Sequence, residues 1–210
     1  MGAESPDCLF IQFAREPVAG AVKTRMIPYL SPREACALHS ELVLWTAATL
    51  VAARLGRVEL AVAGAVGHSL FQDCLGLGVA SLTLQRGADL GARMYNALVA
   101  GLDRFERVVL VGSDCPSIDR DYLNQALAAL YQDDIVLGPA ADGGYTLVGA
   151  RRVPREMFEG ISWGTAAVYA ETTLRLQRSG VAWSALPVLN DIDRPGDLPA
   201  WMALRATRGG

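Results

Sequence analysis

Three cations surround one glycine in residues 15–25, which read REPVAGAVKTR. Gly20 permits a close approach of the backbone to a ligand, and Lys23, Arg25 and Arg15 could bind phosphate oxygens. A Walker phosphate-binding loop would carry glycine directly before this lysine, where a valine stands. A solvated basic loop would have the same composition, but the position directly after an apolar run favours phosphate binding.

Carboxylates stand in two other loops that follow apolar runs. Asp114 lies in GSDCP directly after RVVLV, where it could hold a divalent cation or simply turn the chain. Near the C-terminus, alternation along DIDRPGD puts Asp191 and Asp193 on the same side, so one or both could complete a metal site with Asp114. These carboxylates could instead cap the last helix, which is the interpretation we prefer for Asp197.

Further polar and aromatic residues allow two interpretations each. In GPAADGGY, Asp142 could accept from a hydroxyl while Gly143 and Gly144 let backbone amides approach a ligand, but Asp-Gly is also a hairpin turn. Asp89 could contact a base or ribose, or only cap the helix that follows. Trp163 could stack on a ring or belong to the core.

Alternating strands and helices must position these loops. The expected strands cover residues 8–14, 58–63, 79–84, 107–111, 134–137, 145–148 and 181–189, and the expected helices cover 31–55, 69–75, 92–105, 119–132, 165–179 and 195–205. This order predicts an α/β fold with a mainly parallel sheet and helices on both faces. Ligands then bind beyond the carboxyl ends of the strands, where the loops described above lie.

Composition narrows the class of protein. The 210 residues are 51% hydrophobic and 20% charged with a net charge of −3, which predicts one folded domain over residues 1–210 and argues against a nucleic-acid partner. The longest uncharged apolar run, 42–53, is too short for a membrane span, and no secretory signal is expected. Scattered cysteines fit a cytoplasmic protein. Neither histidine has a hydrolase partner, and the oligomeric state is left open.

Six segments occur together in the order known from one family. They are FAREPVAGAVKTRM, GADLGARM, VLVGSDCP, VLGPAADGGY, FEGISW and DIDRPGDL. Over about residues 8–200 the chain resembles the bacterial DUF2064 family, also called glycosyltransferase-like or radical-SAM/selenodomain-associated transferase 1. That family looks like a relative of the 2-phospholactate guanylyltransferases in the nucleotide-diphospho-sugar transferase (GT-A) superfamily.

The resemblance implies a GT-A, Rossmann-like sheet with a nucleotide over its N-terminal half. Gly20, Lys23 and Arg25 look like the glycine-rich loop of nucleotidyltransferases, with Lys23 as the catalytic lysine. The full set expected to bind the nucleotide is Arg15, Gly20, Lys23, Arg25, Asp89, Gly91 and Ser113.

The same resemblance implies a metal and an acceptor. Asp114 and, less directly, Asp193 would hold Mg²⁺ or Mn²⁺, with Asp191 as the alternative to Asp193. The acceptor would be a small molecule, and Asp142 would orient or deprotonate its hydroxyl group. The residues expected to line the acceptor site are Asp142, Gly143, Gly144 and Trp163. We therefore expect a divalent-metal-dependent transferase that takes a nucleotide-activated donor. The reaction expected first is glycosyl transfer from a nucleotide-diphospho-sugar. The alternative is nucleotidyl transfer with pyrophosphate release, and the second alternative is non-catalytic nucleotide binding.

Overall fold

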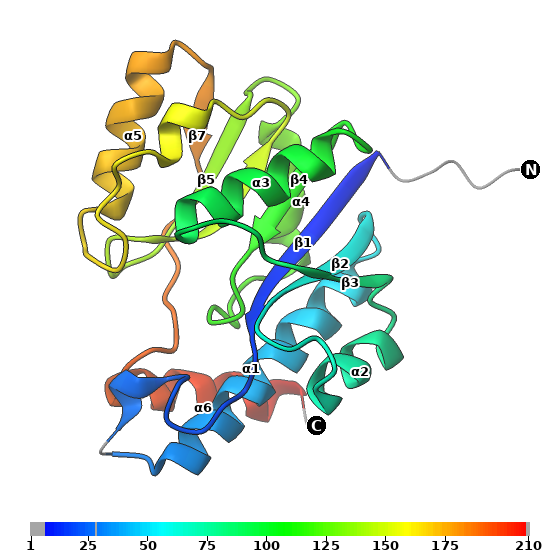
Figure 1. The fold of residues 1–210 in the computed structure, drawn as a ribbon, viewed down its shortest axis with the longest axis vertical. Coiled ribbons are helices and arrows are strands. Elements are labelled where there is room, and N and C mark those ends of the chain that lie inside the picture. The colour runs from blue at the N-terminus through cyan, green and yellow to red at the C-terminus, as the bar shows by residue number, and fades with distance from the viewer. Residues whose placement is uncertain (1–6, 28, 209–210) are drawn as a thin grey trace, which may run out of the picture.

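One sheet organises the computed structural model, which describes residues 7–27 and 29–208. Its seven strands lie in the order β3-β2-β1-β4-β6-β5-β7 (Figure 1). Their bounds are β1 Cys8–Arg15, β2 Arg57–Ala63, β3 Ser81–Leu84, β4 Arg107–Val111, β5 Ile135–Pro139, β6 Tyr145–Ala150 and β7 Trp183–Ala185. Only β6 runs antiparallel to its neighbours β4 and β5; the other pairs are parallel. The predicted mainly parallel α/β sheet is confirmed.

Helices cover both faces of this sheet. Their bounds are α1 Pro32–Ala53, α2 Ser69–Gly76, α3 Leu90–Leu102, α4 Arg120–Ala129, α5 Val168–Ser179 and α6 Leu198–Arg208. The side chains of β1 alternate between two cores: Phe10 packs in the core with α1, α2 and α4, whereas Leu9 packs in the core with α3 and α5. The prediction of helices on both faces is therefore confirmed.

A third, smaller core joins the region around η1 and α1 to the C-terminal region around α6. Met26 and Leu42 pack with Ile192 and Trp201, which places α6 along the N-terminal half of α1 (Figure 1). Met26 belongs to a short 3₁₀ helix, η1 (Thr24–Met26), inside the loop that follows β1. This core therefore fixes the basic loop against the segment that carries Asp191 and Asp193.

Helix α1 begins as predicted and ends earlier than predicted. Ser31 accepts a hydrogen bond from the Glu34 backbone and Glu34 accepts from the Ser31 backbone, which completes a capping box. The helix ends at Ala53 because Arg54 takes a left-handed conformation with φ 54°, two residues before the glycine expected to stop it. Gly56 is needed for a different reason: a Cβ there would collide with the carbonyl of Cys8.

The length and hydropathy of α1 would suffice to cross a membrane, but its packing explains its apolar character. Half of the apolar window is buried inside the protein, and the helix contributes Val43, Ala47 and Leu50 to the core against the sheet. We therefore interpret α1 as a core helix, in agreement with the sequence-based expectation.

Strand β7 is shorter than the nine residues expected. It pairs with β5 over three residues, after which Pro187 has no N–H to donate. Only single hydrogen bonds continue, from the Leu189 N–H to the Pro139 carbonyl at 3.0 Å and from the Ala141 N–H to the Leu189 carbonyl at 2.9 Å. This loose segment carries the chain to the carboxyl ends of the strands.

Candidate functional site

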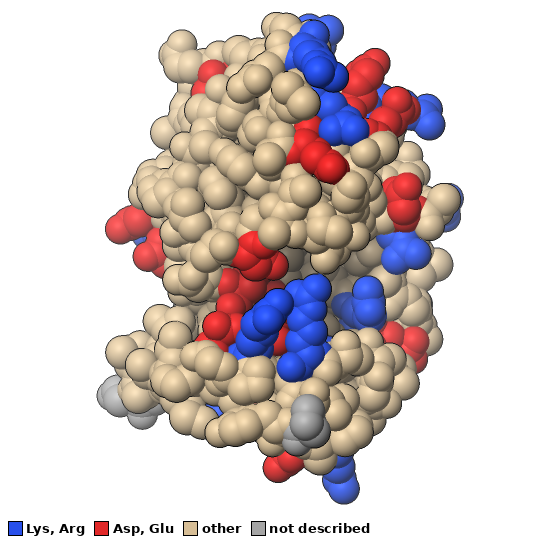
Figure 2. All heavy atoms as spheres, turned by 90° about the vertical axis from the view of Figure 1, so that its left-hand side faces the viewer, with Lys and Arg blue, Asp and Glu red and all other residues tan. Residues whose placement is uncertain are grey.

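A cavity of about 640 Å³ opens at the carboxyl ends of β1, β2 and β4. Figure 2 shows a hollow in which Lys and Arg side chains lie beside Asp and Glu side chains. The expected site residues that line the cavity are Arg15, Lys23, Arg25, Asp89, Ser113, Asp114 and Asp193. Those that lie outside its lining are Gly20, Gly91, Asp142, Gly143, Gly144, Trp163 and Asp191, the alternative metal ligand. Most of the charged groups expected at the site therefore meet in one place.

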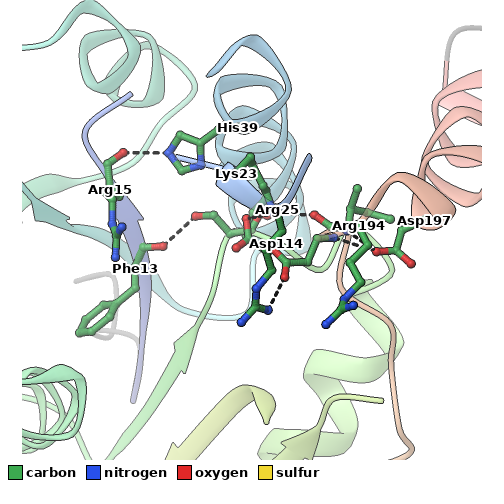
Figure 3. A network of polar contacts seen from close by, with 12 residues as sticks. Phe13, Arg15, Lys23, Arg25, His39, Asp114, Arg194 and Asp197 are labelled. Carbon is green, nitrogen blue, oxygen red and sulfur yellow. Dashed lines mark hydrogen bonds and ion pairs between the residues drawn. The ribbon is translucent and has the colours of Figure 1, made fainter. Parts of the chain in front are cut away.

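Lys23 is the most enclosed cation of the site. It caps η1 in a left-handed conformation with φ 49°, and its side chain is only 2% exposed. Its Nζ donates to the Ile192 carbonyl at 2.5 Å and lies 2.7 Å from Oδ1 of Asp114 (Figure 3). One ammonium thus joins the loop after β1, the loop after β4 and the segment before α6.

The loop after β4 is fixed by buried polar groups. The Ser113 hydroxyl donates to the Phe13 carbonyl at 2.8 Å and accepts from Nε2 of Gln12 at 2.9 Å, so its hydrogen bonds lie within the fold. The backbone carbonyl of Asp114 accepts from the Ile192 N–H at 2.8 Å. Its side chain is 45% exposed, so Asp114 is anchored by its backbone while part of its carboxylate faces the cavity.

The two aspartates left open by the sequence have different partners. Arg25 donates to Oδ2 of Asp193 at 2.6 Å. Asp191 is only partly exposed, and burial, reinforced by the carboxylates of Asp114 and Asp142, raises its pKa to about 7. The structure therefore groups Asp191 electrostatically with Asp114, whereas it pairs Asp193 with an arginine.

Asp197 has the role preferred from the sequence. Its Oδ2 accepts from the Asp193 N–H at 2.9 Å and from the Arg194 N–H at 2.7 Å, at the start of the 3₁₀ helix η3 (Pro195–Asp197) that leads into α6. Figure 3 shows this cap beside Arg25. The prediction that Asp197 caps the last helix is confirmed, and the cap sets the course of the segment that bears Asp193.

Several polar residues at the cavity wall were not predicted from the sequence, among them His39, Gln85 and Arg93. His39 on α1 is buried, and its Nε2 lies 2.8 Å from the Arg15 carbonyl; burial lowers its pKa, which favours the neutral ring. Gln85 donates through Nε2 to the carbonyls of Ala14 at 3.3 Å and Ala61 at 2.9 Å. The sequence offered one signal for each of these two residues: His39 falls on the buried side of α1, and Gln85 directly follows β3.

The entrance to α3 is built by packing as well as by polar contacts. Asp89 caps the helix, accepting from the Ala92 N–H at 2.7 Å, and it also lines the cavity. A Cβ on Gly91 would lie 2.6 Å from the Trp163 ring, and that ring stacks on Phe158 at 6.5 Å between centroids. The contacts of Gly91 and Trp163 are thus with each other and the core, which fits the core interpretation of Trp163.

The Asp-Gly sequence between β5 and β6 forms a hairpin turn, and its aspartate also lies near the other carboxylates of the site. Asp142 accepts from the Gly144 N–H at 3.0 Å, and Gly143 takes φ 91° where a Cβ would collide with the Ala166 backbone. The turn is therefore a hairpin. Asp142 is exposed beside the cavity, and its charge still contributes to the pKa of Asp191.

The donor set is small for a metal site made by protein alone. Among residues 7–27 and 29–208, no group of three or more His, Cys, Asp or Glu side chains is arranged to hold a metal ion. Mg²⁺ is commonly held by one or two carboxylates together with substrate phosphates. Asp114 lines the cavity beside Lys23, and Asp191 interacts electrostatically with Asp114 from outside the lining, so this donor set would fit only a metal that also binds phosphates.

The fold is one that transferases share. A Desulfovibrio desulfuricans protein, provisionally named a nucleotide-diphospho-sugar transferase, is 31% identical with a TM-score of 0.81, over 91% of this chain and 84% of that one. CMP:2-keto-3-deoxy-manno-octonic acid synthetase, solved with CTP, is 12% identical with a TM-score of 0.59 over 96% and 99% of the chains. A Mycobacterium tuberculosis protein solved with manganese is 19% identical with a TM-score of 0.53 over 93% and 98%. These last two likenesses concern the fold alone.

The family follows from sequence. Residues 46–165 match the family described as an uncharacterized protein conserved in bacteria, DUF2064. The chain belongs to this family, and the relative at 31% identity places it among the transferases of this fold. No curated protein matches the chain.

Proposed function

We propose that the protein is a divalent-metal-dependent transferase that takes a nucleotide-activated donor, with glycosyl transfer from a nucleotide-diphospho-sugar as its reaction. The observation that carries this proposal is the ion pair of Lys23 with Asp114 at the carboxyl ends of parallel strands, in a cavity that Arg15 and Arg25 also line. Asp191 lies outside this lining and is close enough to Asp114 for the two carboxylates to interact electrostatically. Carboxylates for a cation and cations for phosphates are thus combined in one cavity.

Donor phosphates would bind beside the basic loop. Arg15 is exposed at the end of β1, and Arg25 is held in place by its ion pair with Asp193. Both guanidiniums can donate two hydrogen bonds to one phosphate. Gly20, with φ 85° and open space around it, lets the backbone of this loop approach the same phosphates.

The nucleoside would lie between the basic loop and α3. Asp89 and the amide of Gln85 line this part of the cavity and offer oxygen acceptors for base or ribose hydroxyl and amine groups. Gly91 and Ser113 would support the walls of the site, Gly91 by its packing against Trp163 and Ser113 by its hydrogen bond to the Phe13 carbonyl.

Asp114 and Asp191 would hold Mg²⁺ or Mn²⁺. The bound metal would supply Lewis-acid stabilisation of the charge that develops on the departing diphosphate. Manganese in the mycobacterial protein of the same fold supports this choice of ion. Lys23, Arg15 and Arg25 add fixed positive charge on the other side of the phosphates.

Asp142 would serve the acceptor. Its carboxylate is exposed on the β5–β6 hairpin, outside the lining of the cavity, where it could accept the proton of an acceptor hydroxyl. The hydroxyl oxygen then forms the bond to the anomeric carbon while that carbon's bond to the diphosphate oxygen breaks. The nucleoside diphosphate leaves with the electron pair.

Nucleotidyl transfer is the second candidate, and the position of Lys23 favours it. A compact ammonium in contact with a metal-binding carboxylate is suited to neutralise an α-phosphate under attack. In that reaction an acceptor oxygen bonds to the α-phosphorus and pyrophosphate leaves. The metal site and cavity are the same in both candidates, which therefore differ in the product released.

The test is a panel of nucleoside triphosphates and nucleotide-diphospho-sugars with Mn²⁺ and small-molecule acceptors. Release of a nucleoside diphosphate supports glycosyl transfer, and release of pyrophosphate supports nucleotidyl transfer. Thermal-shift titration with the same panel, with and without Mn²⁺, forms the first step. If none of these nucleotides raises the Tm, the proposal is contradicted; if they raise it without turnover, the protein is a nucleotide-binding protein. We expect the protein to act in the cytoplasm.

A further inference from the structure

Lys23 is the only lysine in the chain, beside 18 arginines. An arginine carries a broad planar fork, whereas the lysine ammonium is a compact point charge with three donors. The only ammonium on a lysine side chain is also the most enclosed cation of the site, with its side chain 2% exposed. A compact charge is therefore used at the one position where the cation is surrounded by a carboxylate and a backbone carbonyl.

The contacts of Lys23 take up one of the two oxygens of Asp114. Nζ lies 2.7 Å from Oδ1, which is buried, and 2.5 Å from the Ile192 carbonyl. The loop fixes this position, since Lys23 caps η1 and its carbonyl accepts from the Met26 N–H at 2.9 Å. In this arrangement Lys23 neutralises the carboxylate that the proposed function assigns to the metal.

Charge makes the lysine and a divalent cation competitors for this carboxylate. Like charges a few ångströms apart in a partly enclosed site repel each other, so a second cation at Asp114 is opposed by the ammonium already there. Asp191 is affected in the same way, because Lys23 opposes the rise in its pKa that burial and the carboxylates of Asp114 and Asp142 cause. Phosphate oxygens offer the ammonium an equally good partner.

We propose that Lys23 is the internal counter-ion of Asp114 and Asp191, and that it suppresses the binding of a bare divalent cation until donor phosphates accept its ammonium. This inference rests on the proposed function, because it takes Asp114 as the residue that holds the metal. Lys23 exchanges Asp114 for a phosphate oxygen, and Asp114 becomes available to the metal. Metal and donor then bind cooperatively, and the metal alone binds weakly.

The test measures Mn²⁺ binding by electron paramagnetic resonance at one pH and salt concentration, with no nucleotide present. Lys23→Met removes the ammonium and keeps the length of the side chain, and we expect Mn²⁺ to bind about tenfold more tightly. Lys23→Arg keeps the charge and should show no such gain. Arg15→Gln is the matched control: it removes a cation that lines the same cavity and forms no ion pair within the described residues. We expect it to change the affinity by less than about threefold.

An unchanged or weaker Mn²⁺ affinity in folded Lys23→Met protein overturns the inference, and so does absence of Mn²⁺ binding by both proteins. If Lys23→Met does not fold, wild-type protein labelled with ¹⁵N-lysine gives one side-chain signal to follow during Mg²⁺ titration. We expect this signal to shift and lose its protection from solvent exchange as Mg²⁺ saturates Asp114. An unaltered signal at saturation overturns the inference. These measurements use neither donor nor turnover, so failure of the proposed transfer reaction is seen separately in the nucleotide panel.

Discussion

Two clusters of charged side chains occupy opposite ends of the sheet, and they are built differently. Towards the amino ends of the strands, Glu59 is 4% exposed and accepts from Arg104 at 3.0 and 2.9 Å and from Arg57 at 3.1 Å. These hydrogen bonds, led by those of Arg104, lower the pKa of Glu59 in spite of its burial. At the carboxyl ends, burial and neighbouring carboxylates instead raise the pKa of Asp191 to about 7.

The difference lies in the balance of charge. One carboxylate at the amino ends has two guanidiniums, so its charge is satisfied inside the protein. At the carboxyl ends Lys23 pairs with Asp114 and Arg25 pairs with Asp193, whereas Asp142 and Asp191 form no ion pair within the described residues. A satisfied cluster contributes to the stability of the fold, whereas a cluster that leaves carboxylates without an ion pair is suited to bind a cation from solution.

The largest expected effect comes from removing the central carboxylate of the second cluster. Asp114→Asn should lower metal-dependent nucleotide binding and transfer by about a hundredfold, because the neutral amide no longer attracts the metal. The protein should still fold, since the amide oxygen can accept from Lys23. Circular dichroism checks the fold, and Mn²⁺-dependent nucleotide titration checks binding. Unchanged metal dependence would remove Asp114 from the proposed site.

Substitutions in the first cluster, around Glu59, should lower stability and leave activity unchanged. Arg104→Met leaves the buried Glu59 with one partner in place of two, and we expect it to lower the free energy of unfolding by about 2 kcal/mol. Arg57→Met removes a single hydrogen bond and should cost about 1 kcal/mol. Urea denaturation gives both values. A change in Mn²⁺ affinity of either variant would contradict the separation of the two clusters.

The dependence of stability on pH should also differ between the two clusters. The folded pKa of Asp191, about 7, lies above its ordinary value of 3.8, so its contribution to stability falls as the pH rises through this range. The lowered pKa of Glu59 acts in the opposite sense, and its contribution is lost as the pH falls below the ordinary value of 4.5. Metal binding to Asp191 must release its proton, so Mn²⁺ affinity should rise about tenfold per pH unit below pH 7.

Comparison of Asp191→Asn with the wild type checks this dependence. The variant should lose the fall in Tm between pH 4 and 7 and the rise in Mn²⁺ affinity over the same range. The loss of stability below pH 4.5, which Glu59 causes, should remain. Identical profiles of Tm against pH in the two proteins would show that Asp191 is not the titrating group.

Local chemistry explains what the sequence predicted well. Apolar runs such as RVVLV mark strands whose both faces are covered, and Ser31 with Glu34 marks the start of α1 because the cap needs only neighbouring residues. The parallel order of the strands then placed Asp114 and the basic loop at one edge. Fold class and the region of the site were therefore predictable.

Contacts between distant segments explain what the sequence did not predict. Lys23 and Ile192 are 169 residues apart, and nothing near Lys23 indicates that its ammonium would contact a carboxylate as well as a carbonyl. The packing of Trp163 on Gly91 likewise depends on two segments that the fold brings together. The proposed preference for Asp191 over Asp193 as metal ligand rests on the ion pair of Asp193 with Arg25, which alternation along one strand cannot reveal.

The smallest expected effect concerns the ion pair of Asp193. Its partner Arg25 is 50% exposed, so Asp193→Asn should lower the free energy of unfolding by less than about 1 kcal/mol. Mn²⁺ affinity should change by less than about threefold, because Asp193 is engaged with Arg25, whereas the KM for the donor should rise a few-fold as Arg25 becomes less well positioned. Metal titration and steady-state kinetics separate these effects. A loss of Mn²⁺ affinity as large as that of Asp114→Asn would instead assign the second carboxylate of the metal site to Asp193. Asp191 would then be a buried carboxylate that does not bind the metal.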